Sequence, residues 1–396
     1  MRTHIYRFAF AMLFLSVLMS CARNEAPQRR SDSRSTLDHL VIKEVFYIGH
    51  AYTQDFPKEY PQPSTQNWYA DDAYITIYNP TSEVKYLDGL ALCSTALDPS
   101  TLLEFEGNKD FRREYLGVGT ISYFPGSGKE HPIQPGQTVV IAKYAIDHAK
   151  EYFARLNKQA DEYGEEREDP KRYKGVDSLI DLTKADWEWT HSDYDRQHMN
   201  NPNVPDLVPI LTGVDKKGAK YSDFGIKQIS GQNGIALIQL PWTPEDFREN
   251  YQDTKERLGY RHYINVTNSL FADFYAIEIP FSKALDCITV CPKRRYKINP
   301  YKNTFDKGNN AVTEVSAKNL PKSDWQKYSG LALIRKWDGK KFVDDNNSTS
   351  DFTVQPASLG LKKPTTSEKY SLLRSTGFLI YILYALAPMC SLQPWG

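Results

Sequence analysis

The sequence predicts a mainly β protein: an antiparallel β-sandwich that carries long insertions and one amphipathic helix. Short segments rich in β-branched and aromatic residues recur through most of the chain. Clusters of Pro, Gly, Asn and Asp separate these segments, as turns do. Only residues 143–163 change to the 3.6-residue period of a helix. Many short strands separated by turns are typical of two packed antiparallel sheets.

The first strands follow from β-rich composition and alternating side chains. Residues 40–48 are β-branched and aromatic, and residues 73–79 alternate between two faces. Residues 83–94 are expected to form the next strand, with a bend at Asp88-Gly89. Residues 49–71 contain three prolines and are predicted to be a long loop.

The remaining elements frame a helical and loop insertion at residues 143–232. Its helix is predicted from the apolar positions Ala145, Ile146, Ala149, Tyr152, Phe153 and Leu156. The charged stretch from Glu165 to Lys174 is expected to be exposed loop. Further strands are predicted at 119–124, 138–142, 234–240, 274–280, 286–290 and 331–336.

The N-terminus indicates export and lipid attachment. Residues 1–20 have a basic start followed by an apolar run from Phe8 to Met19, which is the length of a signal-peptide core and too short for a membrane span. The run ends in Leu18-Met19-Ser20-Cys21, which resembles the bacterial lipobox. There the chain is cut before the cysteine, the thiol receives a lipid, and a fatty acyl chain such as palmitate is added to the new N-terminus. We therefore expect Cys21 to anchor the protein in a membrane, because several acyl chains hold a protein stably.

The lipidated segment 21–37 is expected to be a flexible tether, since it is polar and basic and contains too few apolar residues to form a core. Without residues 1–20 the chain keeps 47 of its 49 basic residues and all 49 acidic ones. A chain with so little net charge has no strongly basic field, so nucleic acid is not an expected partner.

Four cysteines remain after Cys21, too few for a disulfide scaffold of this size. Cys287 and Cys291 are four residues apart on a predicted strand, which separates them by about 13 Å. That distance is too long for a disulfide. We predict that both are core residues.

Two β-segments resemble the opening of a lamin-tail-type domain, which is an immunoglobulin-like β-sandwich. They are Ala73-Tyr-Ile-Thr-Ile-Tyr-Asn-Pro-Thr-Ser82 and Val84-Lys-Tyr-Leu-Asp-Gly-Leu-Ala-Leu92. Pro135-Gly136 with the strand after it resembles the next hairpin of that family, and residues 345–352 resemble its closing segment.

A wider resemblance, over residues 38–374, is to a family of Bacteroidota cell-envelope lipoproteins of unknown function. It rests on Val41-Ile-Lys-Glu-Val-Phe46, Ala145-Ile-Asp-His148, Leu182-Thr-Lys-Ala-Asp-Trp-Glu-Trp189, Asn201-Pro-Asn-Val-Pro-Asp206 and Lys293-Arg-Arg-Tyr-Lys297. The resemblance implies one elaborated sandwich domain and supplies no catalytic residues. Residues 375–396 depart from the pattern with a dense apolar run. That tail is interpreted as a frameshifted or disrupted end, a buried last strand or a second anchor.

Sequence motifs for common enzyme chemistries are missing. No Gly-rich phosphate loop precedes a helix, and no His-Glu-x-x-His pair occurs. Ser127 lies between two glycines, but its flanks do not match a nucleophile elbow, and it is predicted to be a turn residue. His191 and His198 share a polar loop that is expected to be solvated. No cofactor is therefore expected.

Acidic loops offer the remaining metal candidates. Asp71-Asp72 precedes a strand, and a second loop contains the candidates Asp344, Asp345, Asn347 and Asp351. Calcium prefers such carboxylate and carbonyl oxygens. The competing interpretation is a turn in which Asp and Asn side chains bind their own backbone.

The functional hypotheses rest on the predicted membrane anchor, because no catalytic motif was found in the sequence. The first hypothesis is a non-enzymatic binding or accessory lipoprotein of the outer membrane that serves a β-barrel protein. Residues 49–71 and 143–232 would be its contact surfaces, with Trp68, Trp187 and Trp189 as anchors or, alternatively, core residues. The alternatives are an envelope hydrolase acting on glycan or peptide, and a structural or adhesive surface protein.

Overall fold

The computed structural model describes residues 37–102, 104–105, 110–189, 199–211, 213–214, 220–221, 233–241, 243, 260–267, 270–301, 305–312 and 330–360. The predicted signal peptide 1–20, Cys21, most of the tether, the loop with His191 and His198, and the tail 375–396 lie outside the described residues. The described residues belong to one compact unit.

One of the two large sheets has six strands in the order β12-β10-β4-β1-β20-β21. Its central strand β1 is buried at all six positions, as expected for a strand covered on both faces. All neighbours pair antiparallel except β12, which runs parallel to β10. The strands are β1 (Val41–Phe46), β4 (Tyr74–Tyr78), β10 (Thr138–Ala142), β12 (Trp187–Glu188), β20 (Leu331–Arg335) and β21 (Phe352–Pro356).

The other large sheet is eight-stranded, with the order β19-β16-β6-β8-β18-β17-β7 and with β13 paired to β8. All of its pairs are antiparallel. The strands are β6 (Leu90–Thr95), β7 (Glu104–Phe105), β8 (Tyr115–Tyr123), β13 (Val208–Leu211), β16 (Asn233–Gln239), β17 (Tyr260–Thr267), β18 (Leu270–Pro280) and β19 (Ala284–Val290).

The main core joins these two sheets. Ile42 and Ile75 of the first sheet share one buried cluster with Leu92, Leu237 and Ile288 of the second. Two antiparallel sheets with a common core form a β-sandwich, so the predicted fold class is confirmed. A second cluster, which includes Cys93 and Cys287, covers other positions of β6, β16 and β19.

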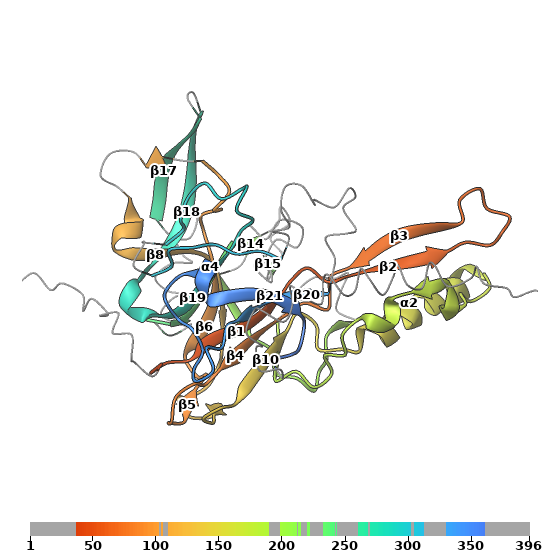
Figure 1. Cartoon of the computed structure of the whole chain (residues 1–396), viewed down its shortest axis with the longest axis horizontal. Coiled ribbons are helices and arrows are strands. Elements are labelled where there is room, and N and C mark those ends of the chain that lie inside the picture. Colours follow the sequence, from red (N-terminus) through yellow and green to blue (C-terminus); the bar gives the residue numbers. More distant parts are fainter. Residues whose placement is uncertain are drawn as a thin grey trace, which may run out of the picture. The chain divides into compact units, whose positions relative to one another are not determined.

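Residues 49–71 are not the long loop that their prolines suggested. They form a hairpin of β2 (His50–Asp55) and β3 (Ser64–Tyr69), to which β11 (Tyr173–Lys174) adds a third strand. The prolines lie in the connecting loop and just before β3, where they remove no ladder hydrogen bond. Tyr52 contacts Tyr152 of helix α2 (His148–Tyr163), with 5.3 Å between ring centroids, and Figure 1 shows the hairpin beside α2.

Helix α2 starts five residues later than predicted, because its N-cap is Asp147. The Asp147 side chain accepts a hydrogen bond from the backbone N–H of Lys150 at 3.1 Å, and Gly164 ends the helix in the left-handed conformation. The rest of the 143–232 segment contributes β12 to the first sheet and β13 to the second. No helix among the described residues is long and apolar enough to cross a membrane.

Short elements complete the structure. Buried Asn79 holds the turn after β4 by donating to the carbonyls of Glu83 and Ile133, each at 2.8 Å. The remaining elements are β5 (Lys85–Tyr86), β9 (Pro132–Ile133), β14 (Gly213–Val214), β15 (Lys220–Tyr221), α4 (Ser348–Asp351), η1 (Phe111–Arg113), η2 (Pro170–Arg172), η3 (Val176–Ser178) and η5 (Phe281–Lys283).

Candidate functional site

An open pocket of about 250 Å³ lies where β9, β10 and β12 meet. Its polar lining includes Glu130, His131 and Asp186, and its apolar lining includes Val139 and Trp187. A concave site that combines an aromatic ring with a few convergent polar groups is the usual form of a ligand-binding site.

The loop before β9 wraps around the carboxylate of Asp88. Asp88 Oδ1 accepts hydrogen bonds from the N–H groups of Gly128 and Glu130 at 3.3 and 2.9 Å, and Oδ2 accepts one from His131 at 2.8 Å. Burial alone would raise the pKa of Asp88, but these backbone donors outweigh it and lower that pKa. Asp88 therefore stays ionised and holds the loop in place.

Gly126 is required for this close approach. Its φ is +146°, and a Cβ there would lie 2.0 Å from Asp88 Oδ1. Gly128 also has a positive φ, of +114°, but a Cβ there would meet no atom within 4 Å. A side chain at either position would strain the backbone, but only one at Gly126 would also clash with Asp88.

The same loop brings three potential metal ligands together. One ligand atom each of Asp88, Glu130 and His131 lie within 4.8 Å of one another, and no other such group of His, Cys, Asp or Glu occurs among the residues with described positions. Ser127, predicted to be a turn residue, donates from its hydroxyl to Glu130 Oε1 at 2.6 Å. The His131 ring contacts Trp187 edge-on, with 4.8 Å between centroids.

The opposite wall of the pocket carries Asp186. Its Oδ2 accepts a hydrogen bond from Val140 N–H at 2.8 Å, and burial raises its pKa. Next to it, buried Glu188 accepts hydrogen bonds from Ala145 N–H at 2.7 Å and Asn201 N–H at 3.0 Å. Burial raises the pKa of Glu188 to about 7. Glu188 does not line the pocket. Glu130 and Asp186 place carboxyl groups on two sides of it, which favours a cationic ligand.

The predicted tryptophan anchors separate into two groups. Trp187 and Trp189 are each 3% exposed and belong to the main core, so the proposal that they are surface anchors is wrong and the core alternative holds. Trp68 is 53% exposed on β3. The sequence could not distinguish them, because each lies in a short aromatic segment and burial depends on what packs against it.

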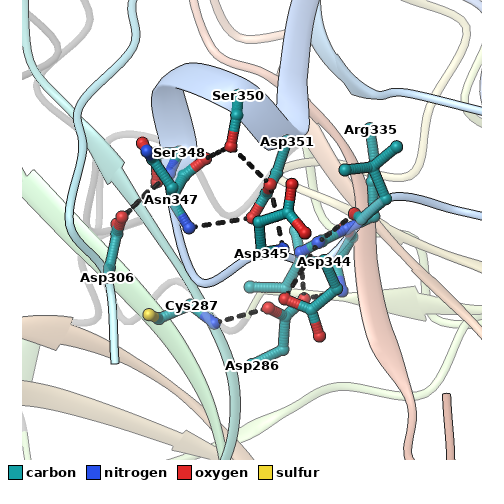
Figure 2. Close-up of polar contacts among 12 residues, drawn as sticks. Asp286, Cys287, Asp306, Arg335, Asp344, Asp345, Asn347, Ser348, Ser350 and Asp351 are labelled. Carbon is teal, nitrogen blue, oxygen red and sulfur yellow. Dashed lines mark hydrogen bonds and ion pairs between the residues drawn. The ribbon is translucent and has the colours of Figure 1, made fainter. Parts of the chain in front are cut away.

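The acidic loop predicted as a calcium candidate is part of a buried charged centre, shown in Figure 2. Fully buried Arg335 lies at its middle and donates to Asp286 Oδ2 at 2.5 Å. Asp344 Oδ1 lies 3.6 Å from Arg335, and its Oδ2 lies 3.5 Å from Nε2 of His39. Although burial opposes ionisation, His39 and Arg335 lower the pKa of Asp344 to about 2.

The other candidates in this loop bind their own backbone. Asp351 accepts hydrogen bonds from the N–H groups of Asp345 and Asn347 at 3.1 and 2.9 Å, and Asn347 caps the short helix α4 (Figure 2). This is the turn interpretation of Asp344, Asp345, Asn347 and Asp351. The side-chain oxygens of Asp344, Asn347 and Asp351 serve protein partners, which favours a structural role for them over calcium binding. Asp345 is exposed and joins the turn through its backbone N–H.

The acidic pair Asp71-Asp72 and the core cysteines have structural roles too. Asp71 pairs with Lys143 at 2.7 Å, and buried Asp72 accepts from His50 at 2.8 Å. Cys287 and Cys291 are buried in the core, as predicted, and so is Cys93.

The sequence did not indicate that Asp88, Glu130 and His131 lie together. Asp88 was recognised only as part of a bend, and Ser127 only as a turn residue. The available signal was the glycine-rich, charged segment 126–131, but its meeting with a residue about forty positions earlier requires the hairpin between them.

Comparison with known proteins agrees with this architecture. A crystal structure of a DUF4876 family protein from Bacteroides thetaiotaomicron VPI-5482 is similar, with a TM-score of 0.51 and 17% sequence identity, over 84% of this chain and 75% of that one. At that identity the similarity shows a shared fold. No curated protein matches the sequence significantly. The family model described as "Protein of unknown function (DUF4876)" matches residues 134–358, more than half of the chain, and the chain therefore belongs to this family.

Proposed function

We propose that this protein is a lipid-anchored lipoprotein of the bacterial cell envelope, held in the outer membrane through Cys21. It acts there as a non-enzymatic binding or accessory subunit of a β-barrel system. Its sandwich is related to the immunoglobulin-like, lamin-tail-like domains. The support for the anchor is the lipobox-like sequence before Cys21, and the support for binding is the exposed side of the β2–β3 hairpin.

The hairpin has a buttressed side and an exposed side. On the side that faces α2, Tyr69 and His148 share a hydrogen bond of 2.7 Å. On the same side, Tyr152 donates a hydrogen bond of 2.9 Å to Tyr52. These contacts join both strands to α2. The hairpin is therefore held in place by α2, although its strands belong to neither of the two large sheets.

The exposed side presents Trp68, while Ala51, its partner across the hairpin, is partly buried against the main core. Beside this pair, Gln66 donates to Thr53 at 2.7 Å. At the hairpin loop, Tyr60 is 58% exposed and stacks on Phe56 with 5.4 Å between centroids. We define the hairpin surface as Thr53, Tyr60, Gln66 and Trp68. Exposed aromatic rings on a supported strand are typical centres of protein–protein interfaces.

The anchor is tested by changing Cys21 to Ser in cells of the native host. The wild-type protein is expected in the outer-membrane fraction and to incorporate labelled palmitate, whereas Cys21→Ser loses the label and leaves that fraction. A variant that keeps its size and stays membrane-bound without the label would contradict the proposal.

The binding role is tested by affinity purification of the intact protein from its native membrane. We expect a β-barrel protein to co-purify, and Trp68→Ala to reduce its yield at least about tenfold, as loss of an interface hot spot does. The matched control is Leu102→Ala, which removes another exposed apolar side chain outside the hairpin. Equal recovery from both variants would exclude the hairpin surface as the contact.

A further inference from the structure

We propose that Asp88, Glu130 and His131 form a binding site for a divalent transition-metal ion such as Zn²⁺, with an open coordination position facing the pocket. This inference depends on neither the lipid anchor nor the hairpin surface. It concerns a different part of the chain, the connection between β8 and β9 and the bend at Asp88.

The spacing of the donor atoms meets the first requirement. The three ligand atoms lie within 4.8 Å of one another, so small rotations of the side chains would bring all three to one ion. Ligands around a tetrahedral zinc ion, each about 2.0–2.2 Å from the metal, are themselves separated by roughly 3.3–3.6 Å. The required movement falls on Glu130, which is exposed and would exchange its hydrogen bond from Ser127 for the ion.

The type of donor selects the class of metal. One imidazole and two carboxylates suit zinc and its neighbours, whereas calcium prefers six to eight oxygen ligands. Asp88 contributes a buried charge whose position is set by three backbone N–H groups. His131 is oriented by its edge-on contact with Trp187. Two of the three ligands are thus held before the ion arrives, and such support is characteristic of metal sites.

The pocket is the second, independent observation. Glu130 and His131 both line it, so an ion at the cluster would face a space of about 250 Å³. Three protein ligands with a fourth position open to solvent or to another molecule distinguish exchangeable sites from closed structural ones. Asp186 on the same pocket adds a negative charge that favours cation entry. The open position would accept water or a donor group from a bound partner.

The test is calorimetric titration of the full chain, purified in detergent and stripped with chelator, with ZnCl₂ alone. We expect one site whose affinity falls at least about tenfold in His131→Gln and in Glu130→Gln. The matched control is Glu83→Gln, which removes an equally exposed carboxylate elsewhere and should leave the affinity unchanged. Both ligand variants spare the backbone contacts of Asp88, although His131 is half-buried against Trp187. A cooperative melting transition without metal will confirm that they fold.

Titration with CoCl₂ gives a second readout, because visible absorption bands report the coordination sphere of the ion. The bands of wild type should be lost in His131→Gln and kept in Glu83→Gln. The proposal is overturned if neither metal binds the wild type, if His131→Gln binds as tightly as wild type, or if CaCl₂ binds as tightly as ZnCl₂. The last result would mean that the imidazole is not a ligand.

Discussion

Two clusters of acidic and basic side chains in this protein resemble each other in composition but differ in surroundings. In the charged centre, which comprises His39, Asp286, Arg335, Asp344 and Asp351, each carboxylate is hydrogen-bonded or ion-paired within the protein. In the pocket cluster of Asp88, Glu130 and His131, the backbone is held while two of the side chains face an open space.

The difference shows that burial and partners, more than residue type, decide what an acidic cluster does. A charge taken out of water must be compensated inside the protein, so a buried cluster becomes a fastening between segments. The charged centre joins β1, β19 and the loop after β20 in this way, since Arg335 also donates to the Ile42 carbonyl at 2.8 Å. In the pocket cluster, Asp88 is buried but Glu130 and His131 line the pocket, so their side-chain atoms stay accessible to a ligand.

The largest expected effect comes from removing the cation of the charged centre. Arg335→Met leaves Asp286 buried without its partner and should lower the free energy of unfolding by about 3–5 kcal/mol. Urea denaturation measures this loss. Arg113→Met is the control, because Arg113 is exposed and should cost less than about 0.5 kcal/mol. Similar losses in both variants would contradict the fastening role.

The next effect concerns how the pocket loop is held. Gly126→Ala forces a Cβ against Asp88 Oδ1, whereas Gly128→Ala introduces a Cβ into open space at a comparable positive φ. We expect Gly126→Ala to destabilise the protein by about 1–3 kcal/mol more than Gly128→Ala, the usual cost of overpacking. Thermal unfolding compares the pair, and equal values would show that Asp88 does not hold the loop.

Glu188 sharpens the comparison, because it is buried like the charged centre but has no cation among the groups that shift its pKa. Its pKa rises from 4.5 to about 7 on folding. The folded state therefore binds the proton more tightly, and the stability from Glu188 is complete below pH 4.5 and is lost as pH rises through 7. The contribution to the slope reaches at most about 1.4 kcal/mol per pH unit.

Glu188→Gln should remove this slope between pH 5 and 8 in urea denaturation. Glu130→Gln should keep it, because Glu130 is exposed. A wild-type stability that stays constant or rises over this range, with no change in Glu188→Gln, would contradict the assignment of a raised pKa.

The smallest effects are expected in the pocket cluster itself. Without metal, Glu130→Gln should change the free energy of unfolding by less than about 0.5 kcal/mol, as surface substitutions usually do. His131→Gln also loses the ring contact with Trp187 and should cost about 0.5–1.5 kcal/mol. Urea denaturation in chelator measures this. A loss of several kcal/mol would place the pocket cluster with the charged centre, as a structural fastening.

The sequence by itself determined the fold class and most of the framework. Alternation identified β4, Asp88-Gly89 marked the bend before β6, and β10 occupies residues 138–142 as predicted. It also identified α2 from the 3.6-residue spacing of its apolar side chains, and it identified the buried cysteines. These features depend on patterns within a short stretch of sequence, so they can be recognised without knowing the fold.

Only the tertiary structure decided the rest. The polar hairpin β2–β3 is stabilised because α2 packs on one of its sides and β11 pairs with the edge of β2. Its sequence read alone resembles a loop. Trp187 is buried and Trp68 exposed because of what packs against each. Asp88 meets His131, and Arg335 meets Asp286, across long separations in the chain. Burial and long-range pairing are properties of the packed sheets, and no local pattern carries them.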